Sequence, residues 1–191
     1  MRKFIPLIAA LLFAAPALAA PWHVDPLTSH LMFEGAQAGE KFSGSFGKFT
    51  SEIDFDEAAP EKGKITITVD MASVQIEGKD RQDALPTSDW FAVKQFATAV
   101  FTSTSIRADM GHHKDGQPQR YTAKGNLTIR GISKPVELPF LLQTTGNSTL
   151  ASGDLTLNRS NFGVGHGQWK TDEWIKFPVK VSFALHASKA K

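Results

Sequence analysis

The C-terminal stretch W-I-K-F-P-V-K-V-S-F-A-L-H-A, residues 174–187, places a large apolar side chain at every second position. These side chains are Ile175, Phe177, Val179, Val181, Phe183 and Leu185. Successive side chains of a β-strand point to opposite faces, so this period of two predicts a long strand with one buried face. The stretch is therefore interpreted as the last strand of a sheet.

The same period of two recurs upstream. Between residues 65 and 71, Ile, Val and Met side chains alternate with Thr and Asp. Further strands are predicted at residues 30–35, 42–55, 99–106, 121–129 and 136–142, and around Leu155 and Leu157. Gly47 is expected to form a bulge in the second of these, and residues 131–135 a turn. Seven or eight antiparallel strands joined mainly by short turns predict an all-β, up-and-down barrel of about eight strands.

Residues 81–96 are an exception to this pattern. Their apolar side chains cluster at irregular short spacing around Pro86 and are Leu85, Trp90, Phe91, Val93 and Phe96. The segment leads directly into the predicted strand at residues 99–106. A short helical insertion of this kind is expected to cover one end of a closed sheet, as a plug or a lid.

The N-terminus has the pattern of a secretory signal peptide over residues 1–19. Arg2 and Lys3 form the positive region, an apolar core follows, and Ala17-Leu18-Ala19 is a small-residue cleavage site. The mature protein is therefore predicted to be one domain, residues 20–191, located in the periplasm. The whole chain contains no cysteine, so neither disulfides nor thiol chemistry are expected.

The charge of the mature chain is balanced. Removing Arg2 and Lys3 from the 21 basic residues leaves 19, which equals the number of acidic residues. A neutral chain with scattered charges offers no broad electrostatic surface, so nucleic acid is not expected as a partner.

Catalytic motifs are not found in the sequence. It contains neither a G-x-S-x-G nor an H-E-x-x-H motif, and its six histidines are scattered except for His112 and His113. That pair could bind a metal adventitiously, but no functional metal site, catalytic residue or cofactor is predicted. The chain is interpreted as a binding protein and not as an enzyme.

Six motifs in a fixed order resemble the YceI-like family of periplasmic polyisoprenoid-binding proteins. They are W-H-V-D-P at 22–26, F-G-K-F at 46–49, D-W-F at 89–91 after Arg81, F-T-S-T-S at 101–105, G-N-L-T-I-R-G-I-S-K-P-V at 125–136 and R-S-N-F-G-V at 159–164. The resemblance runs from Trp22 to about Ala187. The resemblance implies a lipocalin-like antiparallel barrel with an apolar channel, an isoprenoid ligand and no catalytic activity.

A tail pocket for such a ligand would draw on residues in phase along the strands. The candidates are Phe33, Phe49, Phe101, Leu127, Ile129, Phe140 and Phe183, closed by Trp90, Phe91 and Phe96 of the insertion. Ordinary core packing is the alternative for each. The headgroup candidates are Arg81, Arg159 and His166. Arg159 ends a strand beside a glycine-rich turn, where it could anchor a headgroup or pair with a carboxylate.

Three functions remain open from the sequence. The first is an isoprenoid or prenylquinone carrier, store or scavenger. D-W-F at 89–91 and G-V-G-H-G-Q-W at 163–169 resemble the subgroup associated with membrane cytochrome b561, so the second is an interaction module for such a redox partner. The third is a hydrolase or a quinone-modifying enzyme.

Overall fold

The computed structural model describes residues 22–109 and 117–189. The predicted signal peptide and the His112–His113 pair lie outside these residues. The strands are β1 (Trp22–Val24), β2 (His30–Gln37), β3 (Glu40–Phe46), β4 (Phe49–Asp54), β5 (Lys64–Asp70), β6 (Val74–Ile76), β7 (Thr98–Ala108), β8 (Gln119–Ile129), β9 (Ile132–Thr145), β10 (Ser148–Asn158) and β11 (Pro178–Lys189). The helices are α1 (Lys79–Ala84) and the short 3-10 helices η1 (Pro60–Lys62), η2 (Met71–Ser73), η3 (Arg159–Phe162) and η4 (Gly167–Trp169).

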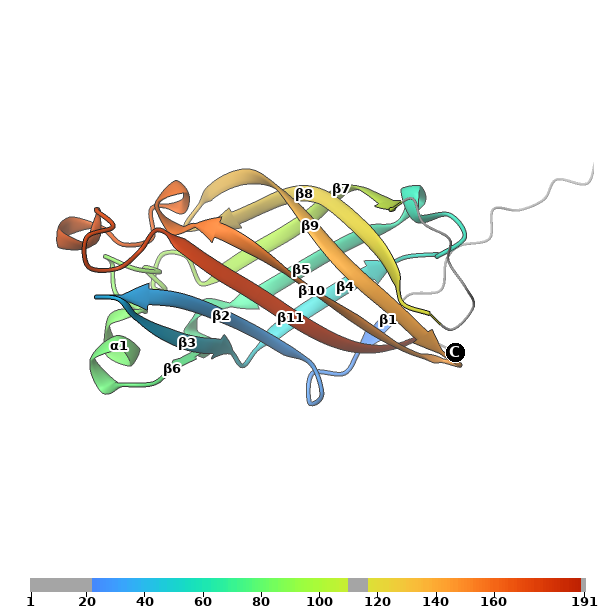
Figure 1. Ribbon diagram of the computed structural model, residues 1–191, viewed down its shortest axis with the longest axis horizontal. Helices are drawn as coiled ribbons and strands as arrows, with labels where there is room; N and C mark the ends of the chain where they lie inside the picture. The colour runs from blue at the N-terminus through green and yellow to red at the C-terminus, as the bar shows by residue number, and fades with distance from the viewer. Residues whose placement is uncertain (1–21, 110–116, 190–191) are drawn as a thin grey trace, which may run out of the picture.

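The strands form a closed antiparallel barrel, as Figure 1 shows. Eight of them make the ring in the order β1-β4-β5-β7-β8-β9-β10-β11, and β1 pairs again with β11. Toward the N-terminal end of β11, the edge that pairs with β1 at residues 187–189 pairs with β2 instead. From β2 the sheet continues through β3 and β6. The prediction of an all-β, lipocalin-like barrel of about eight strands is confirmed.

Several predicted boundaries were wrong. The long strand at residues 42–55 is interrupted at Gly47 and Lys48, where the Gly47 N–H donates to the Ser73 carbonyl. The predicted turn at residues 131–135 is shorter, because β9 begins at Ile132 and Pro135 pairs with Asn126 inside the sheet. The last strand begins at Pro178 and not at residue 174, since the preceding residues belong to the connection from β10.

The helical insertion is only partly helical. In the described part of the chain, α1 is the one α-helix, and residues 85–97 continue as turns closed by backbone hydrogen bonds. They lie at the end of the barrel that also carries α1 and the β10–β11 connection, on the left of Figure 1. The covering position that the sequence predicted is therefore confirmed, although most of the segment is not a helix.

The opposite end of the barrel is filled by aromatic side chains. The indole N–H of Trp22 donates to the carbonyl of Phe55 at 2.8 Å. The Phe55 ring meets the edge of Tyr121, with centroids 5.2 Å apart, and Tyr121 stacks on Phe140 at 5.4 Å. Burial, with Glu57 nearby, raises the pKa of Tyr121 to about 12, so the phenol stays neutral. This packing, to which Phe55 of the β4–β5 connection contributes, closes that end of the barrel.

The long β10–β11 connection is organised by Arg159, which is only 5% exposed. Its guanidinium donates hydrogen bonds of 2.6–3.1 Å to four main-chain carbonyls, those of Val164, Thr171, Ile175 and Lys176. These carbonyls lie in a connection and therefore have no hydrogen-bond donors from a neighbouring strand. The guanidinium of one buried arginine supplies the donors instead.

Four glycines of the wall lie beneath phenylalanine rings. The pairs are Gly35 with Phe42, Gly44 with Phe33, Gly125 with Phe101, and Gly153 with Phe183. In each pair the ring occupies the space that a side chain at the glycine would need, so the rings lie against the wall. The glycines thus help to leave the interior of the barrel open.

Replacing Gly125 by Ala is expected to destabilise the barrel by roughly 1–3 kcal/mol, the usual cost of overpacking. The added Cβ would overlap the carbonyl of Thr102 and lie 2.6 Å from the Phe101 ring. Urea unfolding followed by tryptophan fluorescence measures the change. The matched control is Gly47→Ala, whose Cβ would meet nothing closer than 3.5 Å and should change stability by less than about 0.5 kcal/mol. Equal effects of the two substitutions would contradict the packing argument.

Replacing Arg159 by Met is expected to destabilise the protein by roughly 2–4 kcal/mol, because buried carbonyls would lose their donors. Arg107→Met is the control, since the Arg107 side chain is exposed on β7 and makes no hydrogen bond among the described residues. Thermal unfolding of both variants gives the comparison. A drop in melting temperature no larger for Arg159→Met than for Arg107→Met would show that the connection does not depend on this side chain.

Candidate functional site

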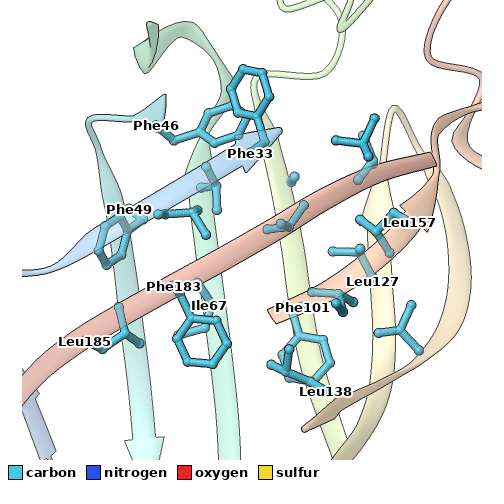
Figure 2. Close-up of a pocket in the computed structure, with 18 of the residues that line it drawn as sticks. Phe33, Phe46, Phe49, Ile67, Phe101, Leu127, Leu138, Leu157, Phe183 and Leu185 are labelled. Atoms are coloured by element: carbon cyan, nitrogen blue, oxygen red, sulfur yellow. The ribbon is translucent and has the colours of Figure 1, made fainter. Parts of the chain in front are cut away.

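The barrel encloses a cavity of about 270 Å³. Figure 2 shows side chains of several strands, among them Phe49, Phe101 and Leu157, pointing into one space. Apolar atoms form the whole surface of the cavity. Thr149 and Arg159 are the polar residues among those that line it, and they contribute no polar atom to its surface.

The wall follows from the period of two in the strands. Along β11, the residues that line the cavity are Val179, Val181, Phe183, Leu185 and Ala187. The residues between them, such as Lys180, face outward, and the Lys180 ammonium lies 3.6 Å from the Asp154 carboxylate on the neighbouring strand. Because every strand alternates in this way, a sheet closed on itself turns one apolar face toward a common interior.

The structure brings together most of the residues proposed for a ligand. The cavity is lined by all seven tail candidates, which are Phe33, Phe49, Phe101, Leu127, Ile129, Phe140 and Phe183. Trp90 and Phe91 line it from residues 85–97, and Arg159 lines it from η3. Contact of each with a ligand stays a prediction.

Three candidates lie outside the cavity wall. The ring of Phe96 packs on the β8–β9 turn, within 2.9 Å of where a Cβ of Gly131 would be. The Arg81 guanidinium lies 5.5 Å from the centroid of the Phe42 ring, and its Nε donates to the side-chain oxygen of Gln37 at 3.0 Å. His166 is exposed in the β10–β11 connection.

One of the two sequence-based interpretations of Arg159, pairing with a carboxylate, is wrong for the described residues, whereas its role as a headgroup anchor stays a prediction. Its donors meet main-chain carbonyls, and among the described residues no carboxylate lies within salt-bridge distance of it. The guanidinium also lies 5.6 Å from the Trp90 ring and 5.2 Å from the Phe177 ring. Burial lowers the pKa of Arg159, and the nearby Asp172 partly opposes this effect.

Other wall residues were missed by the sequence interpretation. Phe42 and Phe46 lie in phase within the predicted strand at residues 42–55, so the period of two could have identified them. Phe162, Val164 and Ile175 come from the β10–β11 connection and pack with Trp90 in one buried cluster. The first two of these lie in an aperiodic, glycine-rich segment that gives no such signal.

A smaller, polar pocket of about 180 Å³ lies beside Phe42. It is lined by Glu34, Lys41, Phe42, Ser43, Glu77 and Arg81. Phe42 also lines the large cavity, so its ring separates an apolar space from a polar one. Over residues 22–109 and 117–189, no group of three or more potential metal ligands is present, and no helix is long and apolar enough to span a membrane.

Comparison with known proteins gives consistent matches. The family model of the YceI-like domain matches residues 22–187. A UPF0312 protein of Photorhabdus laumondii is 31% identical over 170 residues, which cover 83% of this chain and 84% of that protein. A UPF0312 protein of Pseudomonas fluorescens is 29% identical, over 88% of this chain and 90% of the relative.

Solved structures show the same fold. The crystal structure of BcnA from Burkholderia cenocepacia has a TM-score of 0.79 and 31% identity, covering 87% of this chain and 100% of that one. A polyisoprenoid binding domain from Saccharophagus degradans has a TM-score of 0.67 and 13% identity, covering 91% and 99%. The second likeness concerns the fold alone. Since the domain model covers most of the chain, the protein belongs to the YceI-like family.

Proposed function

We propose that this protein binds the hydrocarbon chain of an isoprenoid lipid inside its barrel. The observation that carries the proposal is a cavity whose whole surface is apolar. Such a surface suits hydrocarbon and leaves any polar group in a ligand without a partner. The related fold of a polyisoprenoid binding domain supports the same ligand class. The cavity surface presents no acid, base or nucleophile, which supports binding as opposed to catalysis.

Hydrocarbon burial alone can supply the affinity. Two isoprene units contain ten carbon atoms, and at about 0.8 kcal/mol for each buried carbon group they contribute roughly 8 kcal/mol. That is about the free energy of micromolar binding. Ordering a flexible chain opposes it, so a few further buried units are needed. No hydrogen bond inside the cavity is required for this affinity.

The headgroup would lie outside the cavity at the end covered by residues 85–97. The other end is closed by Trp22, Phe55, Tyr121 and Phe140, as described above. Arg81 lies beside the polar pocket at the covered end, and among the described residues its side chain donates a hydrogen bond only through Nε. Its remaining donors suit an oxygen-rich headgroup such as a phosphate or a quinone.

The setting that fits this activity is the periplasm, with the protein as a carrier, store or scavenger of isoprenoid lipid. A water-filled compartment next to a membrane requires a protein to shield a prenyl chain from water. The pattern of residues 1–19 supports export.

Filling part of the cavity should weaken this binding. Leu155→Trp enlarges a side chain that lines the cavity, and displacing about two CH₂ groups of ligand weakens affinity at least about tenfold. The matched control is Thr156→Trp, one residue further along β10, where the side chain is exposed. Displacement of the dye N-phenyl-1-naphthylamine by geranylgeraniol measures the affinity. Equal affinities of the two folded variants would place the ligand outside the barrel.

Export is tested by the mass of the mature protein. Cleavage after Ala19 predicts that protein from the periplasmic fraction of its host begins at Ala20. Intact mass spectrometry under native conditions gives the N-terminus, and lipid extraction of the same sample identifies the bound chain. Protein that retains residues 1–19 in that fraction would contradict the signal peptide.

A further inference from the structure

Residues 85–97, called the lid below, cover one end of the cavity without being part of the sheet. Leu85, Trp90 and Phe91 of the lid line the cavity directly. The lid is folded by its own backbone hydrogen bonds, such as Phe91 N–H to the Leu85 carbonyl at 2.9 Å. Since it belongs to no strand ladder, its closed position depends on contacts with neighbouring segments.

Three consecutive carbonyls of the lid accept hydrogen bonds from outside it. The Asp89 carbonyl accepts from the N–H groups of Gly165 and His166, at 2.9 and 2.7 Å. These bonds join the lid to the β10–β11 connection, which is itself a loop. The carbonyls on either side, of Ser88 and Trp90, accept from Nη1 of Arg130, the former at 2.8 Å. Arg130 lies in the hairpin turn between β8 and β9, so it joins the lid to the barrel itself.

The backbone of Arg130 is unusual for an arginine. Arg130 and Gly131 have φ angles of 52° and 72°, the left-handed values of a type I′ turn. Asn or Asp is preferred at the first of these positions, and a residue without such a short polar side chain is disfavoured there. Ala38 and Gly39 form the equivalent turn between β2 and β3, with φ angles of 51° and 88°. The turn geometry therefore does not explain why residue 130 is an arginine. The hydrogen bonds from its side chain to the two lid carbonyls do explain it.

We propose that Arg130 is a positioning residue that holds the lid closed and so sets the rate at which a ligand enters and leaves the cavity. This rests on the proposed function, because the exchanging molecule is the isoprenoid chain. Loss of the guanidinium frees the carbonyls on both sides of Asp89 and leaves the lid joined to the barrel by apolar packing and, at its C-terminal end, by the hydrogen bond from the Met71 N–H to the Ala97 carbonyl.

The lid and the β10–β11 connection are held by different arginines, and comparing Arg130 with Arg159 indicates which of the two loops opens. Arg159 is buried and donates to four carbonyls of the β10–β11 connection. Arg130 is half-buried and donates to the lid through one nitrogen. The lid therefore opens more readily than the connection. The entrance to the cavity would then form beside Trp90 and Phe91.

The test uses Arg130→Asn, which removes the guanidinium and supplies a residue that suits the turn. Losing hydrogen bonds from a charged donor should raise the dissociation rate of the bound dye N-phenyl-1-naphthylamine by about tenfold or more. Stopped-flow fluorescence measures that rate. Hydrogen exchange at the amides of Phe91 and Ala92, both bonded within the lid, should also become faster.

Two variants serve as controls. Ala38→Asn places the same residue at the equivalent position of the β2–β3 turn, which has no hydrogen bond to the lid among the described residues, so dissociation should stay at the wild-type rate. Arg130→Lys keeps the charge and a single donor nitrogen and should give an intermediate rate. It also keeps the test valid if Arg130→Asn does not fold.

The outcomes separate the lid proposal from the proposed function. Unchanged dissociation and unchanged amide exchange in both Arg130 variants would overturn the role of Arg130. If the wild-type protein binds neither the dye nor geranylgeraniol, the proposed function fails, and amide exchange alone decides the role of Arg130. Faster dissociation in Ala38→Asn, equal to that of Arg130→Asn, would attribute the effect to turn chemistry and overturn the proposal.

Discussion

Pairing on both edges of β11 is the constraint on which the cavity depends. One edge pairs with β10 along its whole length, and the other pairs first with β2 and then with β1. The pairing of Trp22–Val24 with residues 187–189 closes the ring, so the apolar inner face of the eight strands surrounds a common interior. Once the sheet is closed, the period of two in each strand turns large side chains inward. The glycines beneath Phe33, Phe101 and Phe183 keep those rings against the wall, so that the interior stays open.

The two ends of the barrel are closed by different kinds of interaction. One end is closed by buried aromatic packing and the Trp22 hydrogen bond, which belong to the cooperative core. The other is closed by two loops, each tied by an arginine to main-chain carbonyls. Segments with few ladder bonds open at lower free energy than a barrel core does. The barrel can therefore stay folded while a loop at one of its ends opens.

Much of the wall could be predicted from the sequence, because strand periodicity and burial have the same physical cause. Ile67 and Val181 are flanked by polar residues, and both line the cavity. The positions of Trp90 and Phe91 could also be predicted, since apolar clusters of that size need cover. The partners of Arg159 and Arg130 could not be predicted, because main-chain carbonyls carry no sequence signal. Pro135 misled the start of β9, since a proline within a strand usually signals a turn or an edge. The start of β11 was placed too early because the period of two continues upstream of Pro178 through Ile175 and Phe177.

An entirely apolar cavity also limits how a ligand can be selected. The wall has no polar atom on its surface, so it cannot form hydrogen bonds that distinguish one ligand from another. Chains of similar length and branching therefore gain similar free energy inside it. Discrimination between ligands must come from the volume available and from groups beyond the wall. The polar pocket lies on the far side of the Phe42 ring, and Arg81 stacks on that ring from outside. The hydrocarbon would supply affinity within the barrel, while the choice of headgroup would be made where Phe42 separates the two spaces.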